Sequence, residues 1–224
     1  MRFRMIKLVL APFVRLFGRP VVEGRAHVPR SGPVILAGNH LSFSDSMFLV
    51  LVLRRRVTFL AKDEYFTTTG LRGLLMRWFF TAAGQIPVDR AHAGRAAASL
   101  RQATAILEEG GIWGIFPEGT RSPDGRLHRG RTGAMRVALA TGAPVVPVVL
   151  HGTDRVNPPG TLIWRPGRVR ITFCPPMDLT PYRGRPHNQA LAREMTDELM
   201  RILAARSGQE YVDVYASAVK KALG

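Results

Sequence analysis

Cysteine is almost absent from this chain of 224 residues, and its scarcity excludes an internal disulfide framework. The one cysteine, Cys174, lies in the run VRITFCPP, where an apolar strand ends at two prolines. We therefore interpret Cys174 as a small buried apolar residue rather than as a nucleophile. A single thiol also fits a reducing compartment.

Long hydrophobic runs are lacking as well. The apolar run nearest the N-terminus, from Leu8 to Val14, spans seven residues, whereas a transmembrane helix needs about 18 or more. Arg15 follows this run directly, and the sequence after it contains no small-residue cleavage site. Neither a membrane span nor an export signal is therefore expected.

Residues 1–19 instead have the pattern of a short amphipathic helix, with Arg2, Arg4 and Lys7 among bulky apolar side chains. Such a helix can lie in an anionic membrane interface, or it can pack on the domain with its basic side in water. Pro12 is expected to bend or shorten the helix, because proline lacks the N–H that a helix interior needs.

Acidic residues are scarce: 16 Asp and Glu stand against 32 Lys and Arg, which gives a net charge of +16. This excess indicates an anionic partner, such as nucleic acid, a membrane surface or a phosphorylated or carboxylated substrate. Aromatic residues make up only 8% of the chain, and several, such as Trp113, lie in apolar runs, so a nucleic-acid-binding surface is disfavoured. The apolar share of 46% is that of an ordinary globular protein.

Short Val- and Ile-rich runs alternate with longer helical patterns along the chain. Strands are predicted at 33–38, 57–61, 85–88, 112–116, 144–150 and 169–173, and helices at 45–53, 71–82, 91–109, 132–141, 187–206 and 209–222. This alternation predicts an α/β fold, a single domain with a mainly parallel mixed sheet flanked by helices. The domain is expected over residues 20–206, with residues 207–224 as a C-terminal helix packed on it. Pro147 indicates an edge or a bulge in its strand.

Motifs that identify two common enzyme classes are also absent. The chain has no Gly-x-Ser-x-Gly elbow of a serine hydrolase, and no second histidine or acid at the helical spacing of a metal site. No metal and no bound cofactor are therefore expected. A His–Asp pair in such a chain would deprotonate a hydroxyl that belongs to the substrate.

The stretch GNHLSFSD places His40 and Asp45 at the start of a strongly apolar helix. One interpretation is structural: Ser42 caps the helix, and Asp45 three residues later completes a capping box. The other is chemical: the Asp45 carboxylate accepts the Nδ1 proton of His40 and leaves Nε2 free as a base. The spacing alone does not decide between them, and the two are compatible at a loop-to-helix junction.

The stretch IFPEGTRSPDG, 115–125, places charge at the end of a predicted strand. The strand ends at Phe116, and a turn with Glu118, Gly119 and Arg121 follows. Ligands bind at the carboxyl ends of strands in open α/β sheets, and arginine can hold a phosphate or a carboxylate there. This turn is therefore a candidate anion site.

The stretch AAGQIPVDR, 82–90, again ends a short strand in charge. Arg90 either binds an anion at this strand end or begins the following helix together with Asp89, whose charge suits a helix N-terminus. The residues alone leave both interpretations open.

Four ordered blocks, NHLSFSD (39–45), GQIPVDR (84–90), FPEGTRS (116–122) and VVPV (145–148), resemble those of the glycerolipid acyltransferase family. Its best-known members are the 1-acylglycerol-3-phosphate acyltransferases of the PlsC type. The resemblance covers residues 20–175, with order and spacing intact. The stretch RGRTGAMRVAL (129–139) also resembles the family's basic segment, with arginine at 129 and 131 where many members carry lysine.

By that resemblance, His40 is the general base that takes the proton of a glycerol hydroxyl, and Asp45 orients and supports it. The hydroxyl attacks the thioester of an acyl-CoA or acyl-carrier protein directly, without an acyl-enzyme. Backbone amides near residues 118–120 are candidate donors to the oxyanion. Substrate contacts fall to residues of the blocks: Asn39, Ser42, Arg90, Glu118, Gly119, Thr120, Arg121, Arg131 and Pro147.

The implied reaction is acyl transfer to the sn-2 hydroxyl of 1-acylglycerol 3-phosphate, which makes phosphatidic acid at the cytoplasmic face of the cell membrane. A membrane-surface partner would give the N-terminal helix and the net charge of +16 a common purpose. The same chemistry on glycerol 3-phosphate, a lysophospholipid or another lipid-linked alcohol stays open, because the blocks report the phosphate and the thioester only. A non-catalytic lipid-binding protein is disfavoured, because both His40 and Asp45 are present.

Overall fold

The computed structural model describes residues 2–62, 67, 69–70, 73–74, 77, 81, 85–88, 95–159, 161 and 163–223. Its strands are β1 (Val21–Glu23), β2 (Val34–Gly38), β3 (Val57–Lys62), β4 (Ile86–Val88), β5 (Ile112–Ile115), β6 (Leu127–His128), β7 (Val145–His151), β8 (Arg170–Phe173) and β9 (Tyr211–Val212). Its α-helices are α1 (Arg2–Gly18), α2 (Asp45–Val52), α5 (Arg95–Glu108), α6 (Gly133–Thr141), α7 (Thr153–Val156), α8 (Gln189–Ser207) and α9 (Ala216–Leu223). Short 3₁₀ helices cover Arg25–His27 and Thr180–Tyr182.

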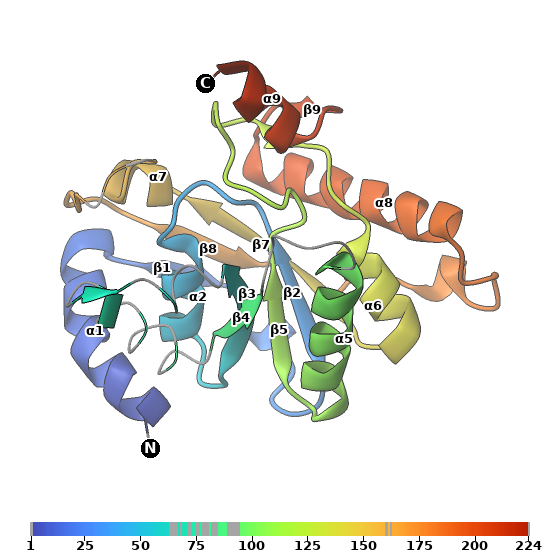
Figure 1. The fold of residues 1–224 in the computed structure, drawn as a ribbon, viewed down its shortest axis with the longest axis horizontal. Helices are drawn as coiled ribbons and strands as arrows, with labels where there is room; N and C mark the ends of the chain where they lie inside the picture. Colours follow the sequence, from blue (N-terminus) through green and yellow to red (C-terminus); the bar gives the residue numbers. More distant parts are fainter. Residues whose placement is uncertain are drawn as a thin grey trace.

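Seven of the described strands form one mixed sheet in the order β1-β8-β7-β2-β5-β3-β4 (Figure 1). Strands β2, β3, β4, β5 and β7 run parallel to one another, while β8 pairs antiparallel with β7 and parallel with β1. The predicted α/β fold with a mainly parallel mixed sheet is therefore confirmed. The parallel strands share one carboxyl edge, where the turns after β2 and β5 lie next to each other because these two strands are paired.

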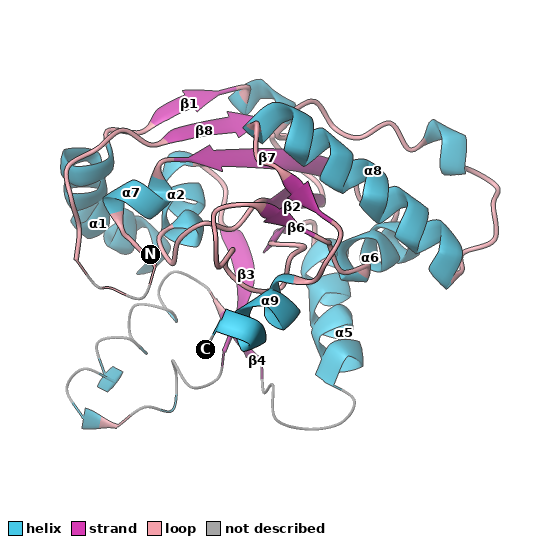
Figure 2. Cartoon of the chain, turned by 90° about the horizontal axis from the view of Figure 1, so that it is seen from above, coloured by secondary structure: helices cyan, strands magenta, loops and turns pink. Residues whose placement is uncertain are grey.

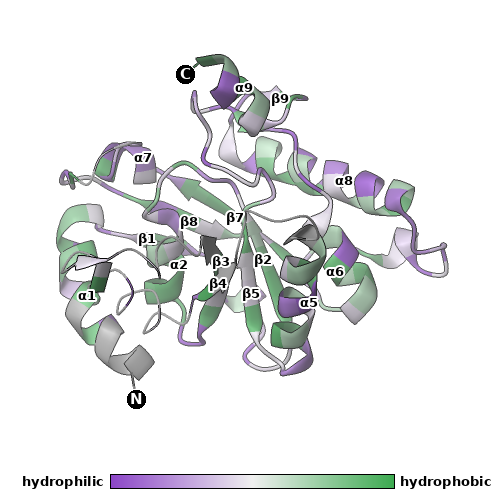
Figure 3. Cartoon of the chain, in the orientation of Figure 1, coloured by the Kyte–Doolittle hydropathy of each residue, from purple (hydrophilic) through white to green (hydrophobic). Residues whose placement is uncertain are grey.

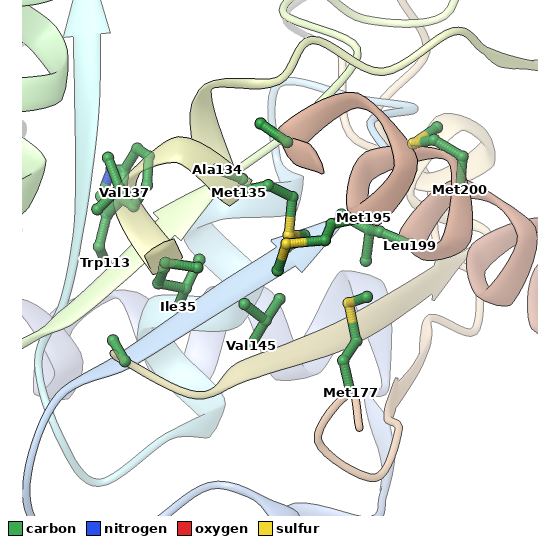
Figure 4. Close-up of a cluster of buried hydrophobic side chains, with 14 of the residues drawn as sticks. Ile35, Trp113, Ala134, Met135, Val137, Val145, Met177, Met195, Leu199 and Met200 are labelled. Carbon is green, nitrogen blue, oxygen red and sulfur yellow. The ribbon is translucent and has the colours of Figure 1, made fainter. Parts of the chain in front are cut away.

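Helices cover both faces of the sheet, with α1, α2 and α7 on one side and α5, α6 and α8 on the other (Figure 2). Alternate side chains of β2 enter the two cores: Val34 and Leu36 join the first, and Ile35 and Ala37 the second. Hydrophobic residues accordingly follow one another along the central strands (Figure 3), as expected for strands buried on both faces. Figure 4 shows part of the second core, with methionines from α6 and α8 packed over the strands.

Pro12 and Pro147 were both expected to disturb their elements. Pro12 does not shorten its helix: α1 continues to Gly18, and its second half is held by Val14, which is buried against α2 and its neighbours. Pro147 marks neither an edge nor a bulge, because β7 pairs on both sides, with β2 and with β8. The Pro147 carbonyl accepts from the Cys174 N–H, just beyond the last paired residue of β8. The proline nitrogen, which has no N–H to donate, therefore lies at the end of the β7–β8 hydrogen-bond ladder.

The C-terminal helix is shorter than predicted. Helix α9 begins at Ala216, and residues 211–212 form strand β9, so the prediction of a helix over 209–222 is wrong for its first half. The predicted helix at 71–82 and the start of the one at 91–109 lie largely outside the described residues. Cys174 is buried, as interpreted, and burial raises the pKa of its thiol. In the described ranges, no helix combines the length and the apolar character that crossing a bilayer requires.

Candidate active site

The turn between β2 and α2 brings His40 and Asp45 into contact. His40 Nδ1 lies 2.8 Å from Asp45 Oδ2, and the main-chain N–H groups of Leu41 and Ser42 donate to the same oxygen at 2.7 and 2.8 Å. The carboxylate is fully buried. It therefore fixes both the imidazole and the backbone that carries it.

The structural interpretation of this turn is correct only in part. Asp45 does accept from the Ser42 N–H, but α2 begins at Asp45 with Ser44 as its N-cap, and no side chain caps the helix. The prediction that Ser42 is the N-cap differs from the structure in the start of the helix, although the bonds of a cap are partly present. Ser42 Oγ donates to Asn157, 2.7 Å from the main-chain oxygen, and accepts from the Ser44 N–H.

The second nitrogen of the His40 ring forms no hydrogen bond with the described residues. Since Nδ1 donates to the Asp45 carboxylate, a neutral imidazole carries its lone pair on Nε2. No hydrogen bond to Nε2 is formed by any residue that the structure describes, and the side chain is 18% exposed. The ring stacks on Phe116, with centroids 4.0 Å apart and planes within 8°, and Phe116 stacks in turn on Phe59. This stack limits the ring to one orientation.

The turn after β5 holds the main chain of His40. Glu118 Oε1 accepts from the His40 N–H at 3.1 Å, and the Ser122 N–H donates to His40 O at 2.8 Å. Glu118 Oε2 accepts from the His128 N–H at 3.0 Å. Burial raises the pKa of Glu118 to about 7, against the opposing effect of the two main-chain N–H donors. Glu118 thus links the NHLSFSD block (39–45) to the FPEGTRS block (116–122), to which it belongs.

Gly119 and Arg131 form the outer part of the same turn. Gly119 has φ +75°, a conformation that glycine adopts readily, and a Cβ on it would lie 2.9 Å from Arg131 Nε. The Arg131 side chain therefore crosses directly over Gly119. The Gly119 N–H donates to Phe116 O within the turn, so this amide is not available to an oxyanion in this arrangement.

Thr120 and Arg121 follow Gly119 and are both partly exposed. Arg121 forms no hydrogen bond or ion pair with other residues in the described part of the chain. Its guanidinium is therefore free to meet an anion next to the His40 turn. Arg90, the remaining arginine predicted for anion binding, lies outside the described residues.

Three side chains predicted to contact substrate have internal partners instead. Asn39 is buried and joins the ends of β2 and β7, since its amide donates to Leu150 O at 3.0 Å and its carbonyl accepts from the Leu150 N–H at 2.8 Å. Ser42 and Glu118 are buried and bonded as described above. All three hold the backbone of the site. Pro147 is buried within β7, where it pairs with Ala37 of β2.

Phe116, Asn157 and His128 were not predicted as site residues. Phe116 comes directly before the charged turn, and this position at a strand end is the signal that could have identified it. No such signal marks Asn157 or His128 in the sequence. The contact of Asn157 joins residues that are far apart in the sequence, and the contact of His128 with Glu118 depends on a buried loop. Within the described residues, no group of three or more His, Cys, Asp or Glu side chains could hold a metal ion.

Residues 19–151 match the family model described as Acyltransferase. The chain is 33% identical over 158 residues to the chloroplastic 1-acyl-sn-glycerol-3-phosphate acyltransferase LPAT1 of Arabidopsis thaliana, covering 70% of this chain and 43% of that protein. It is 31% identical over 134 residues to 1-acyl-sn-glycerol-3-phosphate acyltransferase of Borreliella burgdorferi, covering 60% and 52%. The chain thus spans about half the length of these curated relatives.

A solved structure shares the fold. The crystal structure of the 1-acyl-sn-glycerophosphate (LPA) acyltransferase PlsC from Thermotoga maritima superposes with a TM-score of 0.68 at 25% identity, covering 91% of this chain and 79% of that one. The family match covers more than half of the chain and includes both the His40–Asp45 turn and the Glu118 turn. On this evidence the chain belongs to the acyltransferase family.

Proposed function

We propose that this protein transfers a fatty acyl group from an acyl thioester to the sn-2 hydroxyl of 1-acylglycerol 3-phosphate, which makes phosphatidic acid. The observation that carries the proposal is the His40–Asp45 pair, in which a buried carboxylate holds Nδ1 and Nε2 forms no hydrogen bond with any described residue. The names of the relatives, several of which are 1-acyl-sn-glycerol-3-phosphate acyltransferases, support the choice of acceptor.

In the proposed reaction, His40 Nε2 takes the proton of the acceptor hydroxyl while the hydroxyl oxygen attacks the thioester carbonyl carbon. A tetrahedral intermediate forms, the carbon–sulfur bond then breaks, and the imidazolium returns its proton to the leaving thiolate. The products are an ester and a free thiol, and no acyl-enzyme forms. General-base assistance of this kind contributes about 10² to 10⁴ in rate. Asp45 supports the imidazolium as it forms and maintains its tautomer.

The acceptor phosphate is assigned to the arginines around the Gly119 turn. Arg121 has no ion-pair partner among the described residues, and Arg131 crosses the turn at Gly119. Guanidinium groups bind phosphate in a bidentate fashion, which suits a small dianionic head group. By the family resemblance, Thr120 and Arg90 join this site, and the segment around Pro147 borders the acyl donor. Either acyl-CoA or an acyl-carrier protein can supply the thioester in this scheme.

The N-terminal helix is proposed to lie in the membrane interface on the cytoplasmic face. Leu8 and Leu16 of α1 are well exposed, and so is Ile163 in the loop beside it. The loop packs on the helix through Trp164, whose ring centroid lies 4.8 Å from that of Phe13. Exposed apolar side chains next to basic ones such as Arg15 suit an anionic lipid surface.

The reaction is tested by release of free thiol from palmitoyl-CoA in the presence of a panel of acceptors. The panel contains 1-acylglycerol 3-phosphate, glycerol 3-phosphate, lysophosphatidylcholine and monoacylglycerol. We expect the highest kcat/KM with 1-acylglycerol 3-phosphate. A clear preference for another acceptor would overturn the substrate assignment and keep the chemistry, whereas no acceptor-dependent thiol release would overturn both.

The membrane role of α1 is tested with the double substitution Leu8→Glu and Leu16→Glu. Both side chains are exposed, so the fold should tolerate the change, while the loss of apolar contact with lipid should weaken binding about 10-fold or more. Co-sedimentation with phosphatidylglycerol-containing vesicles measures the effect. Leu223→Glu, which charges an equally exposed leucine on α9, is the matched control. Equal sedimentation of the double variant and the control would contradict the proposal.

A further inference from the structure

A segment near the C-terminus returns to the site, although it lies beyond the residues that match the family model. We call residues 209–217 the C-terminal strap. Its strand β9 pairs in parallel with β6, which follows the Glu118 turn. The pairing is extended on both sides, because the Leu127 N–H donates to Glu210 O at 2.9 Å and the Arg129 N–H lies 3.1 Å from Val212 O. The strap is thus fixed along the basic segment of the site.

The start of the strap reaches the His40 turn. Gln209 Oε1 accepts from the side-chain amide of Asn39 at 2.7 Å, and Gln209 Nε2 donates to Gly125 O at 2.6 Å. Asn39 is the residue directly before His40. The strap therefore spans the site from the catalytic turn to the basic segment.

The far part of the strap holds Arg131. The Arg131 guanidinium carbon lies 5.0 Å from the centroid of the Tyr215 ring, within cation–π range. Its Nη2 donates to Ser217 Oγ at 3.1 Å. On its other side the arginine lies against Gly119, where a Cβ would approach its Nε to 2.9 Å. The side chain is therefore held from three directions, by a ring, a hydroxyl and a turn.

Arg131 and Arg129 share the Tyr215 ring but differ in charge balance. The Arg129 guanidinium carbon lies 5.5 Å from the same ring, and its Nη1 lies 3.4 Å from Asp213 Oδ2. Arg131 has no carboxylate partner in the described part of the chain. The strap thus gives the Arg129 guanidinium a carboxylate partner, Asp213, whereas it orients the Arg131 guanidinium without pairing its charge.

We propose that Tyr215 and Ser217 are positioning residues, which hold the Arg131 guanidinium over Gly119 so that it meets the phosphate of the acceptor. The inference rests on the proposed function in one respect, that Arg131 contacts a phosphorylated acceptor. An unrestrained arginine loses considerable rotamer freedom when it binds an anion, and holding it in place beforehand lowers that loss. The strap therefore acts on acceptor binding rather than on the chemical step.

The test compares Tyr215→Ala and Ser217→Ala with the wild-type protein in two measurements. The first is steady-state kinetics with 1-acylglycerol 3-phosphate and palmitoyl-CoA. We expect Tyr215→Ala to raise KM for the acceptor about 2- to 5-fold, the equivalent of an exposed cation–π contact. The kcat and the KM for palmitoyl-CoA should stay unchanged. The second is calorimetric binding of glycerol 3-phosphate, which should weaken by a similar factor whether or not turnover occurs.

Three further variants separate positioning from general destabilisation. Tyr215→Phe keeps the ring face and should restore wild-type KM. Tyr211→Ala removes another half-exposed tyrosine of the strap, whose hydroxyl donates to Asp213 and to no other described residue, and should leave KM unchanged. In an Arg131→Ala background, Tyr215→Ala should have no additional effect, because the two residues act as one unit.

Each outcome bears on the inference separately from the proposed function. Wild-type turnover together with an unchanged acceptor KM in Tyr215→Ala would overturn the inference and keep the function. An equal loss in Tyr215→Phe and Tyr215→Ala, or an additive loss in the Arg131→Ala background, would also overturn it. Absent turnover combined with weaker glycerol 3-phosphate binding in Tyr215→Ala would overturn the function and keep the inference. Absence of both turnover and binding in the wild type would overturn both.

Discussion

The described part of the chain contains two ion-pair contacts between histidine and aspartate, and they are built in opposite ways. In His40–Asp45, at 2.8 Å, the carboxylate is fully buried and the imidazole is 18% exposed. In His128–Asp124, at 2.9 Å, the imidazole is fully buried and the carboxylate is 23% exposed. The distances are almost equal, so distance does not distinguish a candidate base from a structural contact.

The difference lies in what the second ring nitrogen meets. His128 Nδ1 lies 3.3 Å from Val214 O, so both nitrogens of that ring are occupied. For Asp124, burial would raise the pKa, but hydrogen bonds from Arg126 and His128 outweigh it and hold the pKa below its ordinary range. His40 Nε2 has no such partner in the described residues. A base needs a free nitrogen and a buried acceptor behind it, whereas a structural contact uses every polar atom.

The largest expected effect is that of His40→Ala. Removing the proposed base should lower kcat about 10²- to 10⁴-fold, since that is the usual contribution of general-base catalysis. The unfolding free energy should change little, because the ring is partly exposed and its main-chain bonds to Glu118 and Ser122 remain. Thiol release and urea unfolding measure the two effects. Substantial turnover in a folded variant would contradict the base assignment.

His128→Ala is the matched control for this comparison. Removing a fully buried ring that bonds to Asp124 and Val214 should lower the unfolding free energy by about 1–3 kcal/mol. The kcat of the fraction that remains folded should be close to that of the wild type. His40→Ala should therefore lose turnover and keep its stability, whereas His128→Ala should lose stability and keep its turnover. A loss of turnover in His128→Ala equal to that in His40→Ala would remove the distinction between the pairs.

Asp45→Asn should have the next largest effect. One amide oxygen can still accept from the Leu41 and Ser42 N–H groups, but it no longer supports a charged imidazole. The new NH₂ group would take the place of Oδ1, which is buried and has no hydrogen-bond partner among the described residues. Turnover should fall about 10²-fold, and the unfolding free energy should fall by about 1–3 kcal/mol. A purely structural role predicts the loss of stability without the loss of turnover.

The His40–Asp45 contact could be predicted because it is local. Five residues separate the two, and a strand end followed by an apolar helix leaves few ways to arrange them. The sheet could be predicted from the sequence as well, because its strands are short apolar runs bounded by glycine, proline or charge. The ordered blocks then gave the family.

The contacts that support the pair could not be predicted, because they join distant parts of the chain. Ser42 meets Asn157 across 115 positions, and no local pattern marks either residue as a partner of the other. The capping prediction identified the local bonds of this turn, in which Ser42 Oγ accepts from the Ser44 N–H, but not the donation of the same hydroxyl to Asn157 or the later start of α2. Strand β9 was mistaken for helix because a pair of residues is too short to show a period of two.

Glu118 accepts hydrogen bonds from the main chains of both His40 and His128, so its substitution is the most sensitive test of the comparison between the two histidines. Its Oε1 accepts from the His40 N–H and its Oε2 from the His128 N–H. Glutamine has only one oxygen, so its NH₂ group would face one of these two donors. Glu118→Gln should therefore lower the unfolding free energy at low pH by about 1–3 kcal/mol, the usual effect of an unpaired buried polar group.

The effect of Glu118→Gln should shrink as the pH rises. Burial raises the pKa of Glu118 from 4.5 to about 7, so the folded wild type binds this proton more tightly than the unfolded chain does. The stabilising contribution of that proton is present below pH 4.5 and is lost as the pH rises through about 7, whereas glutamine does not titrate. The difference in unfolding free energy between the two proteins should therefore narrow between these values. Urea unfolding at a series of pH values measures it, with Glu109→Gln as the exposed control. A difference in unfolding free energy that does not change with pH would mean that the folded protein stabilises the ionised Glu118 carboxylate as well as water does.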